Sequence, residues 1–490
     1  MVRKAITELN IKRKKSETSL REIALMIKGK NFSRALFMLE ELKYLPDQFP
    51  LVSTLKGDAL MGLLQYESAI DSFSKSLSQL NLRLSSFLKM AASERAIGHL
   101  HKAIEFYRKA LKISPKNAGI LNSIGNVYKE LGESNNALQC YDQALIRDPK
   151  HIGANFNKGV LLFQEGEVYE AINYFQKIIQ LEQGHFFSLR ALGRAFLNLG
   201  DYKQSLSYFI KAINKRQKDV NLINEVAEVY NRLENFQKSR KVLEYALKLE
   251  PNDPQTYNSL ANVFRKLEDF KTAISFFKRA IKLDSKNDNY ISNLAVAVAE
   301  NGDYKKAIQL YKKALKKNPS SFVTRCNLGV ALMGVGNHRQ AVKEFRYALE
   351  LNNDYAEPHY GLGKLYTELQ KNIEAIKSFK EALKIDINHS RALNGLTFPL
   401  IKSLKFSEGW KHYEYRWKVE PGKSWKHPIE NKAMWNGEID KKVVLWREQG
   451  IGDDILFMGL VPEACKETSK LTIYTLKRLI PLCERGMPGV

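Results

Sequence analysis

The chain has 490 residues, of which 44% are hydrophobic and 27% charged, a balance that supports a large buried core and argues against global disorder. Its 14 prolines, 28 glycines and four cysteines exclude collagen, a low-complexity linker and a disulfide-built scaffold. Lys and Arg outnumber Asp and Glu by 77 to 53, and the net charge of +24 would attract anionic partners. The basic residues are spread along the chain and form no nucleic-acid-binding motif, so nucleic acid is not an expected partner.

Residues 1–15 form a basic N-terminal extension without the apolar stretch of a secretory signal. No later stretch approaches the roughly 18 uninterrupted apolar residues of a membrane helix, so no transmembrane segment is expected. The four cysteines lie far apart and predict free thiols in a reducing compartment. They are Cys140, Cys326, Cys465 and Cys483. These features together predict a cytoplasmic protein.

A period of 34 residues begins at residue 16 and continues in one register to residue 389, giving eleven tandem repeats. In the repeat at 118–151, the small residues Gly125, Ala137 and Ala144 accompany the aromatic Tyr141. A small, an aromatic and a small residue at i, i+4 and i+7 share one helical stripe, which predicts a helix that a neighbour approaches closely. Glycine turns precede this stripe in several repeats, because glycine past a helix end readily adopts the left-handed conformation. Gly132, Gly200 and Gly302 are examples.

Each repeat is therefore predicted to be a pair of antiparallel helices, and the pattern resembles the tetratricopeptide repeat. The resemblance implies an all-α fold, a right-handed superhelical solenoid of helix-turn-helix repeats. It also implies that the first helix of each repeat lines a concave groove. We therefore expect a scaffold that binds an extended peptide or a partner protein, acidic or neutral in charge. The expected groove residues are Asn122, Asn126, Lys129, Arg190, Arg194, Asn224, Asn258, Asn262 and Arg265.

Residues 390–423 are a degenerate twelfth repeat, in which Thr397 and Gly409 hold the small positions. All five tryptophans follow position 409, and residues 424–440 form a linker that contains tryptophan and proline. We expect the aromatic side chains to cap the solenoid end, with sugar stacking as the alternative. The five are Trp410, Trp417, Trp425, Trp435 and Trp446.

Residues 441–490 change period and predict a strand at 443–446, a helix from Asp454 that Pro462 stops, and a strand at 471–474. The turn at Gly450 and Gly452, followed by Asp453, resembles the start of a heptosyltransferase-like glycosyltransferase domain in bacterial tetratricopeptide proteins. That resemblance implies an incomplete Rossmann-like first lobe with Asp453 as general base. The alternative function is thus a glycosyltransferase, or part of one, whose repeats select the acceptor.

Transfer from a nucleotide sugar needs a second lobe, and the chain stops about 50 residues into the first. We therefore expect no transferase activity from this polypeptide and no nucleotide-sugar binding unless a second lobe exists. The histidines show no metal-ligand spacing, so neither a metal site nor a cofactor is expected.

Overall fold

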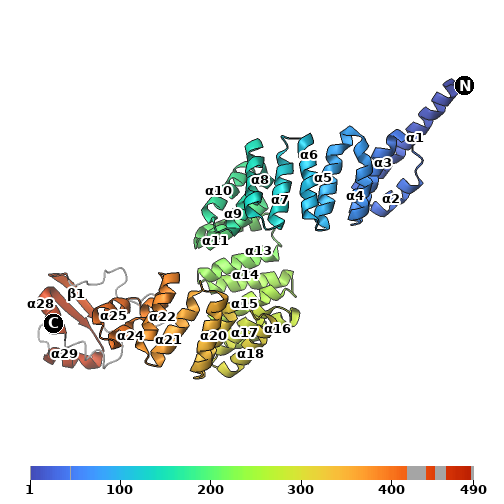
Figure 1. The fold of residues 1–490 in the computed structure, drawn as a ribbon. Helices are drawn as coiled ribbons and strands as arrows, with labels where there is room; N and C mark the ends of the chain where they lie inside the picture. Colours follow the sequence, from blue (N-terminus) through green and yellow to red (C-terminus); the bar gives the residue numbers. More distant parts are fainter. Residues whose placement is uncertain (1, 45, 417–437, 447–459, 487–490) are drawn as a thin grey trace. The chain divides into compact units, whose positions relative to one another are not determined.

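The computed structural model describes residues 2–44, 46–416, 438–446 and 460–486. The chain forms two compact parts, residues 1–301 and residues 302–490, which are described separately. Both consist mainly of paired helices, and the only strands among the described residues lie near the C-terminus (Figure 1). This is the predicted all-α repeat architecture followed by a small α/β segment.

In residues 1–301, eight repeats contribute a first helix and a second helix, and a ninth contributes its first helix, α17. The first helices are α1 (Val2–Lys28), α3 (Phe49–Gly62), α5 (Leu80–Ala96), α7 (Ala118–Glu130), α9 (Ile152–Gln164), α11 (Phe186–Asn198), α13 (Val220–Arg232), α15 (Pro254–Lys266) and α17 (Asp288–Glu300). The second helices are α2 (Phe32–Glu41), α4 (Tyr66–Lys75), α6 (Leu100–Ile113), α8 (Ser134–Arg147), α10 (Val168–Leu181), α12 (Tyr202–Ile213), α14 (Phe236–Leu249) and α16 (Phe270–Leu283). Two 3-10 turns, η1 (Pro46–Gln48) and η2 (Ser76–Ser78), precede α3 and α5.

In residues 302–490, the repeats continue to residue 413. Their helices are α18 (Tyr304–Lys317), α19 (Phe322–Gly334), α20 (His338–Leu351), α21 (Ala356–Glu368), α22 (Asn372–Ile385), α23 (Ser390–Gly395), α24 (Thr397–Lys402) and α25 (Phe406–Tyr413). Among the described residues of the C-terminal segment, the elements are β1 (Lys441–Trp446), α28 (Val461–Glu467), β2 (Thr468–Tyr474), η3 (Lys477–Leu479) and α29 (Ile480–Gly486).

The small and aromatic positions of the repeat form its core, as the period predicts. In the α7–α8 repeat, Ala137, Tyr141 and Ala144 are completely buried. A methyl group on Gly125 would lie 2.6 Å from the Tyr141 ring, so the glycine is needed for this close approach. Fully buried alanines recur at the same positions along the chain, for example Ala103, Ala171, Ala273, Ala341 and Ala375.

The turn between the two helices of each repeat has one residue in the left-handed conformation. The predicted Gly132, Gly200 and Gly302 have φ values of 77°, 77° and 93°. After Gly132, the Glu133 N–H donates to the Tyr128 carbonyl at 2.9 Å, the bond that closes a helix C-terminus of this kind. Residues with a side chain hold the same conformation at the equivalent turn of other repeats, which the sequence did not predict. They are Lys30, Leu64, Glu234, Glu268, Gln370 and Leu404.

Several first helices begin at a capping side chain that accepts a hydrogen bond from a free backbone N–H, whereas α3, α5 and α21 have no such cap. Asp219 and Asp253 cap α13 and α15 in this way. The Nδ1 atoms of His151, His185 and His389 do the same for α9, α11 and α23. These three histidines therefore have a structural role at helix starts.

The last repeat is irregular in its first helix, which is divided into α23 and α24 at Leu396. Pro399 lacks the N–H that would bond the carbonyl of Gly395, and this loss favours a break near that point. Thr397 is buried, and a methyl group on Gly409 would lie 2.6 Å from Ile401, so both hold tight positions as predicted. Trp410 is 49% exposed and packs edge-to-face on Tyr413 of its own helix.

The C-terminal segment contains a two-stranded parallel sheet, and its strands include the two predicted ones. Val443 of β1 pairs with Leu471 of β2, and both pack on Val461 of α28 in a small core. The helix predicted from Asp454 lies mostly outside the described residues, and Pro462 lies in the first turn of the next helix, α28. The backbone N–H groups in the first turn of a helix have no acceptor within that helix. Proline, which has no N–H, is therefore tolerated there. Among the described residues, no helix is both long and apolar enough to cross a membrane.

Candidate functional site

The first helices in residues 1–301 contact one another from repeat to repeat, as α3 does with α5, α7 with α9, and α13 with α15. We call the surface of α3, α5, α7, α9, α11, α13, α15 and α17 the first-helix wall. Second helices contact the next first helix, as in α8 with α9 and α10 with α11. The wall is thus a continuous row of helix faces, and the predicted site residues at 122–265 all belong to its helices.

Two asparagine pairs link successive helices of the wall with the same geometry. The Nδ2 atom of Asn157 donates to Oδ1 of Asn122 at 2.9 Å, and Asn293 donates to Asn258 in the same way at 2.9 Å. Asn122 and Asn258 are half-buried, and within the described residues the Nδ2 atom of neither donates a hydrogen bond. Each pair therefore presents a fixed amide donor at the wall.

The other predicted asparagines have different surroundings. Asn126 accepts a hydrogen bond from the Tyr141 hydroxyl at 2.8 Å, and Nδ2 of Asn262 donates to the Asn258 carbonyl at 3.1 Å. Asn224 is only 5% exposed, and its Nδ2 donates to Oγ1 of Thr256 at 2.8 Å. Asn224 thus joins α13 to α15 inside the stack, and its side chain does not face a ligand.

Arg190 and Arg194 converge on one carboxylate. Arg190 donates to both oxygens of Glu225, at 2.8 and 2.9 Å, and Arg194 donates to Oε1 at 2.8 Å. The hydrogen bond to Glu225 raises the pKa of Arg190. Two cations on one anion leave a net positive charge, and Arg194, with its side chain 52% exposed, carries it at the surface.

Lys129 and Arg265 complete the predicted set of cations. Lys129 is half-buried on α7 beside Glu130. Arg265 pairs with Glu300 on α17 at 2.7 Å, and its side chain is 17% exposed. Arg95 pairs with Glu130 in the same relation between repeats, and this hydrogen bond lowers the pKa of Glu130.

An aromatic cluster that the sequence analysis did not predict lies near these arginines. The rings of Phe156, His185 and Phe187 lie with centroids 6.0 to 6.2 Å apart. Phe187 is 50% exposed, and the guanidinium of Arg216 lies 5.1 Å from its ring centroid. Phe187, Arg190 and Arg194 share one face of α11, because residues three and seven apart lie on the same helical stripe. We call Phe156, Phe187, Arg190, Arg194 and Arg216 the aromatic–arginine patch.

The partners of the predicted residues were also missed, although the sequence carries a signal for them. Asn122 with Asn157, Arg190 with Glu225, and Arg265 with Glu300 are all separated by 35 residues. This separation is one repeat plus one residue, so complementary side chains at i and i+35 indicate contacts between successive first helices.

The second predicted site is the glycine turn with Asp453. Gly450, Gly452 and Asp453 lie outside the described residues, as do Trp417, Trp425 and Trp435. The parallel strands β1 and β2 flank this stretch. The roles predicted for the glycine turn and for Asp453 stay predictions.

Comparison with known proteins identifies the repeats. Models of the tetratricopeptide repeat match residues 93–132, 118–151, 152–185, 188–220, 254–287, 299–336 and 326–390. Protein FlbA of Caulobacter vibrioides is 31% identical over 91 residues, which are 18% of this chain and 15% of that protein. The similarity to this relative thus spans only a small fraction of its length.

Two solved structures are similar at low sequence identity. Yeast Tom70 is 17% identical with a TM-score of 0.45, covering 76% of this chain and 93% of Tom70. A tetratricopeptide repeat protein from Parabacteroides merdae is 21% identical with a TM-score of 0.41, covering 51% of this chain and 99% of that protein. The matches at 118–151, 152–185 and 254–287 coincide with the 34-residue repeats that the buried small and aromatic residues define. The helix pairs of this chain are therefore tetratricopeptide repeats, and the chain belongs to the tetratricopeptide repeat proteins.

Proposed function

We propose that the first-helix wall binds extended segments of partner proteins and that the aromatic–arginine patch is its main point of attachment. The observation that carries this proposal is the half-exposed Phe187 on the same face of α11 as Arg194, on a surface of helices that hydrogen bonds between repeats connect. Aromatic and arginine side chains that can be desolvated together dominate the binding energy of many protein interfaces.

The charge of the patch favours an acidic or neutral partner segment. Arg190 and Arg194 share Glu225, Asp219 lies near Arg190, and Arg216 adds a third guanidinium, so the positive charges exceed the negative charges by one. A carboxylate of the partner would restore neutrality, and added salt would weaken this attraction because exposed charges are screened. The Asn122 and Asn258 amides support the same function, since a fixed amide donor can bond a peptide carbonyl without regard to its side chains.

The experiment is a screen of the full chain against an array of linear peptides, followed by affinity measurement for those that bind. Substituting Phe187→Ser together with Arg194→Ser is expected to weaken binding about tenfold or more, equivalent to at least about 1.4 kcal/mol. Asn258→Ala with Asn262→Ala is expected to weaken binding, and the melting temperature should fall only slightly because one hydrogen bond between repeats, Asn293 to Asn258, is lost.

A matched control removes one aromatic and one arginine from second helices. Tyr169→Ser with Arg147→Ser changes residues on α10 and α8, where both are exposed, and should leave affinity unchanged. Equal affinities of the patch variant and this control would refute the proposal. Peptides that lose affinity only when the tryptophan-rich region after residue 409 is altered would place the binding site elsewhere.

The glycosyltransferase alternative stays a prediction. The family matches given above end at residue 390, and Asp453 lies outside the described residues. Turnover of a nucleotide sugar that disappears in Asp453→Ala would support it.

A further inference from the structure

The junction between α4 and α5 departs from the regular repeat. The second helix α4 has 10 residues where α6 and α8 have 14, and the first helix α5 has 17 where α7 and α9 have 13. The 34-residue register is unchanged. The second helix α4 is therefore about one helical turn shorter than in other repeats, and the next first helix α5 is about one turn longer. The 3-10 turn η2 lies between them.

The local sequence explains this shift. Ser76 occupies a position where most repeats have alanine, and its buried hydroxyl donates to the Phe73 carbonyl at 2.6 Å and contacts Oγ of Ser86 at 2.6 Å. A serine that bonds a nearby backbone carbonyl competes with continuation of the helix. Asn81 stands where several other repeats have the proline that delays the next helix, so α5 begins early.

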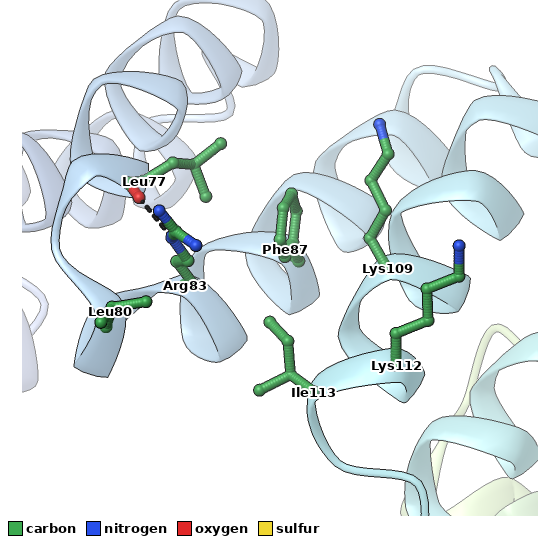
Figure 2. Close-up of a pocket in the computed structure, with 7 residues that line it drawn as sticks. All are labelled: Leu77, Leu80, Arg83, Phe87, Lys109, Lys112 and Ile113. Carbon is green, nitrogen blue, oxygen red and sulfur yellow. Dashed lines mark hydrogen bonds between the residues drawn. The ribbon is translucent and has the colours of Figure 1, made fainter.

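The additional turn of α5 borders a pocket of about 410 Å³ against α6 (Figure 2). Leu77, Leu80, Phe87 and Ile113 give it an apolar lining. Leu80 is 74% exposed and Ile113 is 46% exposed. Apolar side chains gathered around a concave surface favour an occupant that removes them from water.

Three cations surround this lining. Nε of Arg83 donates to the Leu77 carbonyl at 2.8 Å, which fixes the guanidinium and leaves its Nη donors for a ligand (Figure 2). Lys109 is paired with Glu105 at 2.6 Å. Lys112 forms no ion pair with any described residue. Arg83 and Lys112 thus give the pocket an excess positive charge.

We propose that this pocket is a second docking site, which takes an acidic amphipathic segment of a partner protein by inserting its apolar side chains between α5 and α6. Apolar side chains of the segment would cover Leu80 and Ile113, and its carboxylates would meet Arg83 and Lys112. The complementarity of an apolar lining and a cationic rim identifies this ligand chemistry. The proposal does not depend on binding at the aromatic–arginine patch, because none of the pocket residues belongs to that patch.

The exposure of the lining favours a protein segment over a lipid chain as the occupant. A small ligand is usually enclosed over most of its surface, whereas Leu80 and Ile113 are open to solvent at the edge of the pocket. A partner that lies across the opening would cover these edges with its own surface. An amphipathic helix does so with apolar residues at i, i+3, i+4 and i+7.

The test uses the full chain and a fluorescein-labelled peptide of Glu, Ala and Leu, with Leu at i, i+3, i+4 and i+7. Fluorescence anisotropy should show saturable binding that Leu80→Ser with Lys112→Glu weakens about tenfold or more. The matched control is Ile146→Ser with Lys150→Glu, which removes an exposed apolar residue and reverses a charge near the end of the second helix α8. This control should bind the peptide as the unchanged protein does.

Binding of other peptides and of lipid vesicles distinguishes the possible occupants of the pocket. A peptide with Lys in place of Glu, and one with Ser in place of Leu, should each bind at least about tenfold more weakly. Equal binding by the pocket variant and the control, or equal binding of the basic peptide, would overturn the proposal. Vesicles of phosphatidylcholine and phosphatidylserine that displace the peptide and lose binding in Leu80→Ser with Lys112→Glu would assign the pocket to lipid and also overturn it.

Discussion

Substitution of the turn residues in the left-handed conformation would measure backbone strain in this repeat array. Glu234 has φ of 55° and Leu64 has φ of 63°, at the same turn position where Gly132 has 77°. We expect Glu234→Gly and Leu64→Gly to stabilise the protein. A residue with a Cβ atom loses roughly 1 to 2 kcal/mol in this conformation, and glycine avoids that cost.

The expected size follows from two opposing terms. Relief of the strain is offset by the greater freedom of glycine in the unfolded chain, roughly 0.5 to 1 kcal/mol, so each substitution should give a net gain of about 0.5 to 1 kcal/mol. The reverse change at Gly132 should cost a similar amount. A methyl group built on Gly132 meets nothing within 4 Å, so the cost of Gly132→Ala comes from the backbone alone.

The assay combines urea unfolding of the full chain with native-state hydrogen exchange. Long repeat arrays do not always unfold in a single step, so exchange of the Asn235 amide, which donates to the Tyr230 carbonyl at 2.8 Å, reports the local change. Glu234→Ala is the control for loss of the side chain and should change little, because it keeps the strain. Faster exchange in Glu234→Gly, or an unchanged urea midpoint in Gly132→Ala, would refute the reasoning.

Other predictions concern packing and titration. Ala273→Leu should overpack a fully buried position and cost about 1 to 3 kcal/mol in urea unfolding, whereas Ser275→Leu on the exposed side of α16 should not. Burial raises the pKa of Cys326 to about 12, so in a protein with its other cysteines replaced by serine, Ellman's reagent should react only after unfolding. Burial lowers the pKa of His359, because the charged imidazolium is disfavoured in the folded protein. The resulting contribution to stability is present above pH 6.5, the ordinary pKa of histidine, and is lost as the pH falls below that value. Urea midpoints measured between about pH 7 and pH 5 should therefore fall less in His359→Gln, and an equal fall in both proteins would contradict this assignment.

The sequence by itself determined the repeat register, the helix pair of each repeat and the buried stripe. Gly125, Tyr141 and Ala144 can be recognised because their spacing repeats every 34 residues and depends only on the pitch of one helix. The glycine turns are also local, since Gly132 and Gly200 need only their own helix end. The two short strands could be recognised from their apolar runs.

Only the tertiary structure decided which polar residues of the first helices are buried against a neighbouring repeat and which remain partly exposed. Asn224 and Asn258 occupy the same repeat position, yet Asn224 is buried against Thr256 while Asn258 is half-buried beside Asn293. The difference arises from the residues that the next first helix presents, which no single repeat contains.

The structure also decided where the repeat deviates from its average form. Glu234 and Leu64 take a left-handed turn without glycine, because the bonds that close the helix end hold them there. Ser76 shortens α4 and exposes Leu80 at a pocket, although the 34-residue register around it is intact. Such features depend on competition between local hydrogen bonds and packing with the neighbouring repeat, and that balance is set by the assembled stack of helices.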